Sequence, residues 1–359
     1  MEYANYIAHC IEIARRGEYF VAPNPMVGAV LVYNGEGREA KGERIIAEGW
    51  HERYGEGHAE VNCFRNAEEA ISHQQSAISY KDCTLFVSLE PCSHYGKTPP
   101  CAKLIIEKGV GRVVVGMLDP NPLVAGRGVQ MLRDAGIEVV VGVLEAECRA
   151  LNKRFLCLHE QHRPYVVLKW AQTADGYLDR KRELPAPGSE LPVKQALTIS
   201  TTATKRLVHR MRAENMAILV GTRTVLLDNP RLMNTHWEGR NPIRITMDRH
   251  GLIPPTARIL SDEAETIVYR ERTDWPYILT DLAKRGIHSV MVEGGAAVLR
   301  SILESGLWDE AHIEVAPELT LKEPGVPAPN LLQQAKEQPG TIHLTQETVD
   351  GHCLYTLQK

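Results

Sequence analysis

Short apolar runs recur along the first half of the chain, and amphipathic segments separate them. The runs long enough to be buried strands are residues 26–33, 83–92, 112–119 and 137–142. Apolar side chains three and four positions apart predict helices over residues 3–16, 58–71 and 129–136. Gly17 follows the first of these and suits the end of a helix. Because helices alternate with strands, we expect a parallel or mixed sheet covered on both faces.

A longer amphipathic segment, residues 144–163, leads out of this first region and predicts a single helix. Pro164 follows it and precedes a new apolar strand at residues 165–176. We therefore expect two domains, 1–147 and 148–359, with the boundary on the 144–163 helix.

The second region repeats the alternation. Its predicted strands are residues 216–221, 243–248, 265–269 and 288–293, with further strands near the C-terminus. Its predicted helices are residues 202–214, 276–286 and 296–305. Residues 179–195 are polar and rich in proline, which favours a long surface loop. Both regions thus predict α/β folds.

Composition narrows the class of protein. The chain has 359 residues, 41 basic and 45 acidic, and a formal net charge of −4, a balance that argues against nucleic-acid binding. The N-terminal segment lacks the basic and apolar regions of a signal peptide, and we expect no membrane span. Eight cysteines without dense spacing favour a reducing compartment, and we expect the cytoplasm.

A group of metal-ligand residues stands in the first region. His58, Cys92 and Cys101 offer one imidazole and two thiolates, and a catalytic zinc ion takes three such protein ligands and leaves a fourth position open. Glu60 is two residues from His58 and is suited to transfer protons as the catalytic residue. This is the pattern known from zinc nucleobase deaminases.

The spacing between the two cysteines is wide. Cys92 ends a predicted strand, whereas Cys101 begins a predicted helix whose entry Pro99 and Pro100 fix. The residues between them carry His94 and Lys97 toward the same site. Taken singly, each ligand is better explained as a buried thiol or core histidine, but the combination favours a metal.

Four stretches resemble the deaminase half of the bifunctional riboflavin-biosynthesis deaminase–reductases: residues 23–32, 49–61, 89–101 and 119–128. The resemblance implies a cytidine-deaminase-like three-layer domain and hydrolytic deamination of 2,5-diamino-6-ribosylamino-4(3H)-pyrimidinone 5′-phosphate. It also places Asn24, His51, His94 and Lys97 at substrate-binding positions. Alone, His51 is better explained as a solvated loop histidine.

The second region lacks the glycine-rich fingerprint of a dinucleotide-binding fold. A strand does run into Gly294–Gly295 and a helix, which suits a phosphate, although this signal alone is weak. Residues 166–178, 212–232 and 241–249 resemble the reductase half of the same family, which implies a dihydrofolate-reductase-like fold. It also implies NADPH-dependent reduction of the ribosyl chain to ribityl, giving 5-amino-6-ribitylaminouracil 5′-phosphate.

The resemblance carries functional positions onto this half. The NADPH-binding positions are Ala171, Thr224, Asp228, Gly295, Ala296, Ala297, Val298, Leu299, Arg300 and Ser301. The substrate positions are Lys169, Arg212, Leu232 and Glu293. Two positions depart from the family: Thr198 stands where many members have tryptophan, and Thr235 where many have arginine, with Arg231 nearby as a substitute.

Three functions remain open. The first is the two-activity enzyme with one zinc ion per chain and NADPH, acting on small phosphorylated pyrimidines as a homo-oligomer, a dimer or higher. The second is a deaminase whose second domain is a degenerate binding or dimerisation module, which Thr198 and Thr235 support. The third is a polynucleotide-editing deaminase, which the acidic balance and the lack of an aromatic and basic strip argue against.

Overall fold

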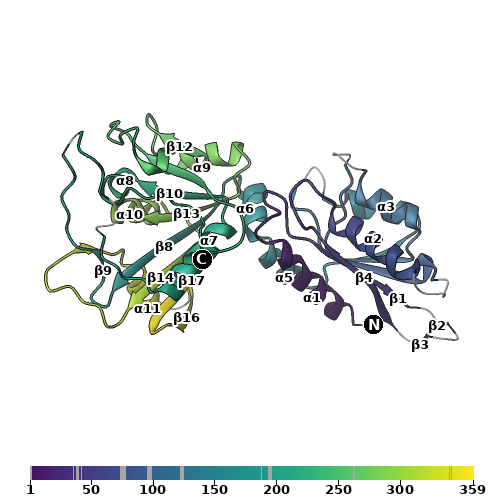
Figure 1. The fold of residues 1–359 in the computed structure, drawn as a ribbon. Helices are drawn as coiled ribbons and strands as arrows, with labels where there is room; N and C mark the ends of the chain where they lie inside the picture. Colours follow the sequence, from purple (N-terminus) through teal and green to yellow (C-terminus); the bar gives the residue numbers. More distant parts are fainter. Residues whose placement is uncertain are drawn as a thin grey trace. The chain divides into compact units, whose positions relative to one another are not determined.

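The structure is a computed structural model, and it describes all residues except 1, 35, 38–39, 42, 73–77, 95–98, 122–124, 187, 193–195, 262, 339 and 341. The chain divides into two compact units, Met1–Gln161 and His162–Lys359. Each unit has its own sheet and its own hydrophobic core (Figure 1). Among the described residues, no helix combines the length and the apolar character that a membrane span requires.

The first unit contains a mixed sheet in the order β4-β1-β5-β6-β7. These strands are β4 (Arg44–Trp50), β1 (Gly28–Tyr33), β5 (Cys83–Leu89), β6 (Arg112–Met117) and β7 (Glu138–Val141). β1 is antiparallel to β4 and β5, whereas β5, β6 and β7 are parallel. A short hairpin of β2 (Glu36–Gly37) and β3 (Ala40–Lys41) comes between β1 and β4 in the chain.

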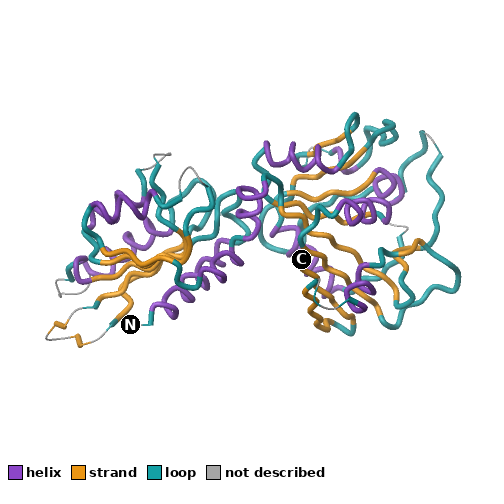
Figure 2. The backbone as a smooth tube through the Cα atoms, turned by 180° about the vertical axis from the view of Figure 1, so that it is seen from behind, coloured by secondary structure: helices purple, strands orange, loops and turns teal. Residues whose placement is uncertain are grey.

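Helices cover both faces of this sheet (Figure 2). They are α1 (Tyr3–Ala14), η1 (Arg15–Gly17), α2 (Ala59–Ser72), η2 (Tyr80–Asp82), α3 (Cys101–Lys108), α4 (Arg127–Asp134), α5 (Glu145–Leu151) and α6 (Lys153–Gln161). Side chains of β1 alternate between the faces, as the period of a strand requires. Ala29 and Leu31 pack in the cluster with α2, α3 and α4, whereas Val30 and Val32 pack in the cluster with α1, α5 and α6.

Two features of the first unit differ from the sequence prediction. The 144–163 segment forms two helices, α5 and α6, because Asn152 interrupts it with a non-helical backbone (φ −107°, ψ 22°). Strand β4 was not predicted; it is an edge strand whose side chains are mostly half-buried, so its apolar alternation is weak.

The second unit contains a sheet in the order β12-β11-β10-β13-β8-β14-β17-β16. These strands are β8 (Tyr165–Thr173), β10 (Ala217–Gly221), β11 (Ile243–Met247), β12 (Thr266–Tyr269), β13 (Ser289–Gly294), β14 (Glu310–Ala316), β16 (His343–Val349) and β17 (His352–Gln358). The pairs from β12 through β14 are parallel, and β17 and β16 are added antiparallel. A separate pair joins β9 (Tyr177–Asp179) to β15 (Val326–Pro327).

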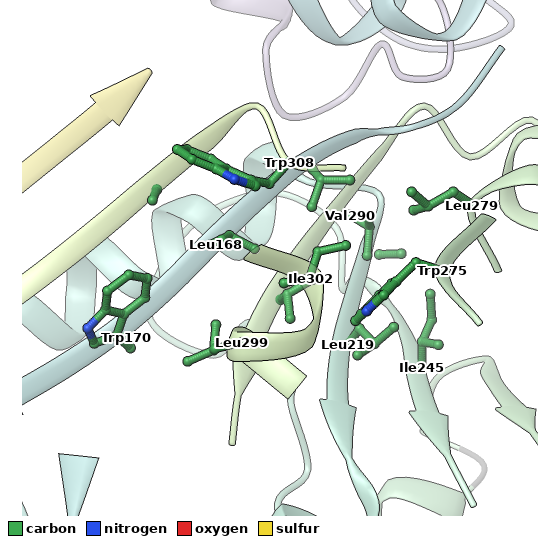
Figure 3. Packing of buried hydrophobic residues seen from close by; sticks show 14 of the residues in the cluster. Leu168, Trp170, Leu219, Ile245, Trp275, Leu279, Val290, Leu299, Ile302 and Trp308 are labelled. Carbon is green, nitrogen blue, oxygen red and sulfur yellow. The ribbon is translucent and has the colours of Figure 1, made fainter. Parts of the chain in front are cut away.

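Helices again pack on both faces. They are α7 (Thr202–Glu214), α8 (Thr222–Asp228), η3 (Arg258–Leu260), α9 (Trp275–Lys284), α10 (Ala296–Ser305) and α11 (Leu331–Glu337). The larger core lies between the sheet and α9, α10 and α11, and Figure 3 shows Leu168, Trp275 and Leu299 within it. A smaller core includes Met211 of α7 and Val225 of α8 on the other face.

Candidate active sites

The predicted metal ligands of the first unit lie together. His58 precedes α2, Cys92 follows β5, and Cys101 opens α3, so three separate elements bring them to one end of the sheet. The Nδ1 atom of His58 lies 3.6 Å from the Cys92 sulfur and 3.4 Å from the Cys101 sulfur. All three ligand atoms lie within 4.8 Å of one another.

These separations fit zinc. Zinc bonds of about 2.3 Å to sulfur and about 2.0–2.1 Å to nitrogen, at a tetrahedral angle, place the ligand atoms about 3.6 Å apart. A hydrogen bond from the Cys101 thiol lowers the pKa of Cys92 to about 4, although burial acts in the opposite direction. The Cys101 backbone N–H also donates to the Cys92 sulfur at 3.3 Å. The same hydrogen bond, with burial, raises the pKa of Cys101, so the two sulfurs share one proton when no metal is bound. A cysteine binds a metal as its thiolate, so a bound ion displaces this proton, and the spacing and chemistry of the donor set fit zinc.

Glu60 lies in the first turn of α2 and is buried. Burial raises the pKa of Glu60 to about 7, and the negative charge on Cys92 acts in the same direction. A carboxyl group with a pKa near neutral both accepts and returns a proton efficiently. Glu60 is thus placed beside the ligand cluster with the properties of a proton-transfer residue.

Asn24 and His51 form a hydrogen-bonded pair next to this cluster. The His51 Nδ1 atom lies 3.1 Å from the Gly57 carbonyl, to which it donates, and Nε2 lies 3.1 Å from the Asn24 Nδ2 atom. His51 is buried, and burial lowers the pKa of its ring, so the imidazole is neutral and Nε2 accepts from Asn24. The interpretation of His51 as a solvated residue is therefore wrong. The ring centroids of His51 and His58 lie 5.5 Å apart.

Gly17 has a packing role here. A Cβ atom at Gly17 would lie 2.3 Å from the His51 carbonyl oxygen, a distance that side chains do not adopt. The residue ends the short helix η1 rather than α1 itself. Glycine is thus required by the close approach of the His51 loop.

The structure describes one of the two remaining predicted substrate-binding residues of the deaminase. His94 is exposed. Burial raises the pKa of Asp119, and a weaker electrostatic interaction with His94 acts to lower it. Lys97 lies outside the described residues. Glu90, which sequence reasoning did not single out, is buried and accepts hydrogen bonds from the backbone N–H groups of Asp119, Gly126 and Val129 at 2.9–3.2 Å. It thereby holds Asp119, Gly126 and Val129 beside the segment that carries Cys92.

The second unit contains a cavity of about 900 Å³. Most predicted reductase residues line it: Lys169, Ala171, Arg212, Thr224, Asp228, Glu293, Gly295, Ala296, Ala297, Val298, Leu299 and Arg300. They come from β8, α7, α8, β13 and α10, elements that are distant in the sequence. A cavity of this volume is large enough for part of a nicotinamide cofactor together with a small substrate.

Three charged side chains meet in this cavity. Arg212 donates from Nε and Nη2 to the two carboxylate oxygens of Glu293 at 3.1 and 3.0 Å, and from Nη1 to the Met233 carbonyl at 2.9 Å. Burial lowers the pKa of Lys169, although Glu293 opposes the shift. Burial acts to raise the pKa of Glu293, but Arg212 and Lys169 outweigh it and the pKa is lowered. Glu293 is therefore a carboxylate and an acceptor.

The Gly294–Gly295 turn connects β13 to α10. Gly294 has φ +111°, which only glycine adopts without strain, and Gly295 is the N-cap of α10. The Thr224 hydroxyl would lie 3.2 Å from a Cβ atom at Gly295. The helix N-terminus and the bare backbone together suit an anionic group of a cofactor.

Two predicted residues lie elsewhere. Leu232 is buried in the smaller core and is not among the residues that line the cavity. The Ser301 hydroxyl donates to the Val298 carbonyl and accepts from Trp275 Nε1. Two residues differ from the family pattern: Thr198 lines the cavity, whereas Thr235 is exposed.

Arg182 and His209 were missed by the sequence prediction, and both line the cavity. Arg182 comes from the predicted surface loop and bridges Asp228, at 2.7 Å, and Asp179, at 2.6 Å. Burial, with Arg212 and His236, lowers the pKa of His209 to about 4, and its Nδ1 accepts from the Thr235 N–H at 3.1 Å. His209 is three residues before Arg212 on α7, so helical spacing could have found it.

Comparison with known proteins identifies both halves. Residues 1–117 match the family model of the cytidine and deoxycytidylate deaminase zinc-binding region. Residues 164–344 match the RibD C-terminal domain.

Full-length relatives agree. The riboflavin biosynthesis protein RibD of Aquifex aeolicus is 37% identical over 337 residues, covering 88% of this chain and 87% of that protein. The Escherichia coli protein of the same name is 36% identical over 349 residues, covering 88% and 87%.

Two solved structures have the same fold. The RibD structure from Acinetobacter baumannii has a TM-score of 0.82 at 33% identity, covering 99% of this chain and 98% of that one. The diaminohydroxyphosphoribosylaminopyrimidine deaminase/5-amino-6-(5-phosphoribosylamino)uracil reductase from Thermotoga maritima has a TM-score of 0.82 at 34% identity, with the same coverage. The chain therefore belongs to the RibD family of riboflavin biosynthesis, enzymes that join a zinc-dependent deaminase to an NADPH-dependent reductase.

Proposed function

We propose that His58, Cys92 and Cys101 hold one zinc ion per chain and that Glu60 is the catalytic proton-transfer residue of the deaminase. This proposal rests on the distances of 3.4 and 3.6 Å from the His58 nitrogen to the two sulfurs, and on the buried Glu60 beside them. Bound zinc supplies a Lewis acid that activates water for attack on the pyrimidine ring. Glu60 takes a proton from the attacking water and returns it to the departing amine nitrogen.

We further propose that Asn24, His51, His94 and Lys97 bind the deaminase substrate. Since Asn24 donates from Nδ2 to His51, its carbonyl oxygen Oδ1 is left to accept from an amino group of the pyrimidine. Neutral His51 fixes this orientation, because its own N–H is taken by Gly57. The exposed His94 and the cation Lys97 suit the substrate phosphate.

In the second unit, we propose that Lys169, Arg212 and Glu293 bind the ribosyl phosphate substrate. Glu293 accepts hydrogen bonds from sugar hydroxyls, and Lys169 and Arg212 pair with anionic or carbonyl oxygens. The Gly295–Arg300 segment, Ala171, Thr224 and Asp228 would hold NADPH, which supplies the hydride for reduction of the sugar carbon. Leu232 and Ser301 remain predicted contacts of substrate and cofactor, respectively.

The reductase domain supports the two-activity enzyme over a degenerate module. The test is incubation with the diaminopyrimidinone ribosyl phosphate, with and without NADPH, while ammonia and both pyrimidine products are measured. Deaminated ribosyl product is expected without NADPH, and ribityl product with it. Deaminated product alone under both conditions would favour the degenerate module.

We also propose a dimer or higher homo-oligomer formed through the second unit, where β16 is an unpaired sheet edge within the described chain. Light scattering of the full chain tests this proposal. We also propose a reducing compartment, the cytoplasm, because Cys92 and Cys101 bind a metal only as thiolates. We propose that residues 1–147 form the deaminase domain and residues 148–359 the reductase domain.

A further inference from the structure

Asn152 lies at the junction of α5 and α6, between the two matched family regions. It is buried, and its side-chain amide pairs with both backbone polar groups of Met26, 126 positions away. Asn152 Nδ2 donates to the Met26 carbonyl at 2.9 Å, and Oδ1 accepts from the Met26 N–H at 2.8 Å. The amide thus holds Met26 as a neighbouring strand would.

The backbone of Asn152 is itself fixed. Its N–H donates to the Arg149 carbonyl at 3.1 Å, and its carbonyl accepts from the Leu156 N–H at 2.9 Å. Cys148 and Leu156 on either side are buried in the cluster that includes α1. The amide is therefore presented to Met26 from a packed support.

The loop that Asn152 holds has few backbone donors of its own. Pro23 and Pro25 flank Asn24 and lack an N–H group. The Asn24 N–H donates to the Val21 carbonyl at 3.0 Å, and the next available donor, that of Met26, is taken by Asn152. The clamp on Met26 therefore limits how far the Asn24 side chain moves from His51.

We propose that Asn152 is a positioning residue of the deaminase, which holds the Asn24 loop in the orientation that binds the pyrimidine. This inference rests on the proposed substrate role of Asn24. It also means that the deaminase extends beyond the boundary at residue 147 proposed above, because a unit ending there lacks the residue that holds its binding loop in place.

The test uses the full-length zinc enzyme and deamination without NADPH. Asn152→Ala removes both hydrogen bonds, whereas Asn152→Asp keeps the acceptor for the Met26 N–H but replaces the donor with an oxygen that faces the Met26 carbonyl. We expect Asn152→Ala to weaken substrate binding through a misplaced Asn24 and so to raise KM about tenfold, which corresponds to about 1.4 kcal/mol, with kcat changed by less than about threefold. Asn152→Asp should raise KM at least as much, because its carboxylate repels the Met26 carbonyl.

Asn34→Ala is the matched control. Asn34 follows the far end of β1 from Met26, and its side chain donates to the Thr84 hydroxyl at 2.7 Å. This control is expected to leave KM unchanged. In all variants, zinc content and reduction of supplied deaminated intermediate should match the wild type, which shows that the chain is folded.

A double-mutant cycle separates positioning from a general structural role. If Asn152 acts through Asn24, Asn152→Ala should add little to the KM of Asn24→Ala. Additive effects, or equal KM changes in Asn34→Ala and Asn152→Ala, would overturn the inference. An unchanged KM in Asn24→Ala would refute the proposed role of Asn24, and the inference with it. A raised KM in Asn24→Ala with a normal Asn152→Ala would refute the inference alone.

Discussion

Replacing Glu293 with glutamine tests whether the charged cluster of the second unit serves reduction alone. The substitution keeps the shape of the side chain but removes its charge. Of the two charge-assisted hydrogen bonds that Arg212 donates to Glu293 at 3.0–3.1 Å, one is lost and the other is left with a neutral acceptor. Both side chains are about 15% exposed or less, so solvent screens the pair weakly. One hydrogen bond to a charged group contributes about 1.5–3 kcal/mol.

At about 1.4 kcal/mol per factor of ten, the loss of one such bond between Glu293 and a sugar hydroxyl of the substrate lowers kcat/KM for reduction about 10- to 100-fold. The assay is NADPH oxidation with supplied deaminated intermediate, and ammonia release without NADPH measures the other half-reaction on the same preparation. Deamination is expected to stay within about twofold of wild type, because its residues lie on the separate sheet of the first unit.

The chain offers a matched control for this variant. Arg231 pairs with Glu263 in the same two-pronged way, from Nε and Nη2, but both side chains are more than 40% exposed and neither lines the cavity. Exposed pairs of this kind contribute about 0–1 kcal/mol. Glu263→Gln should therefore leave both activities near wild type. A loss of reduction in Glu263→Gln as large as in Glu293→Gln would refute the reasoning, as would a parallel loss of deamination in Glu293→Gln.

Further outcomes follow from the two sites. Cys92→Ser should lose zinc, measured by elemental analysis, together with deamination, while NADPH oxidation stays near normal; full zinc retention would contradict the ligand set. Glu60→Gln should retain zinc and an unchanged circular dichroism spectrum, while its deamination rate falls about 10²–10⁴-fold. A fall of only a few-fold would show that Glu60 does not transfer the proton. Because the pKa of Glu293 is lowered in the folded state from 4.5, its contribution to stability is present above that value and is lost as pH falls through the folded pKa. In urea titrations followed by tryptophan fluorescence, the wild type should accordingly lose more stability than Glu293→Gln as the pH falls from 5 to 3, and parallel losses would argue against the shift.

Much of the fold could be predicted because buried strands are continuous apolar runs. Residues 83–92, for example, contain β5 (Cys83–Leu89), which is buried throughout. Helix α7 was predicted over its full range, 202–214. The short α8 was missed, because a seven-residue helix with buried Val225, Leu226 and Leu227 has no amphipathic period to detect.

The sites were predictable to the extent that their residues share compact motifs. His58, Glu60, Cys92 and Cys101 stand in short recognisable stretches, and the structure brings them together. The partners that act from a distance were not predictable. Arg182 lies in a polar, proline-rich loop, and its pairing with Asp228 joins residues 46 positions apart. A local pattern carries no information about such a contact, because the fold alone creates it.

The two separate cores have a thermodynamic consequence. A ligand that binds only the folded form of a unit stabilises that unit by RT ln(1 + [L]/Kd). Zinc should therefore protect the first unit against heat, and NADPH should protect the second. A calorimetric scan of the full chain would then contain two transitions that move independently with the two ligands. A single melting temperature would not describe this enzyme, and a substitution's effect on stability has meaning only for the transition of the unit that contains it.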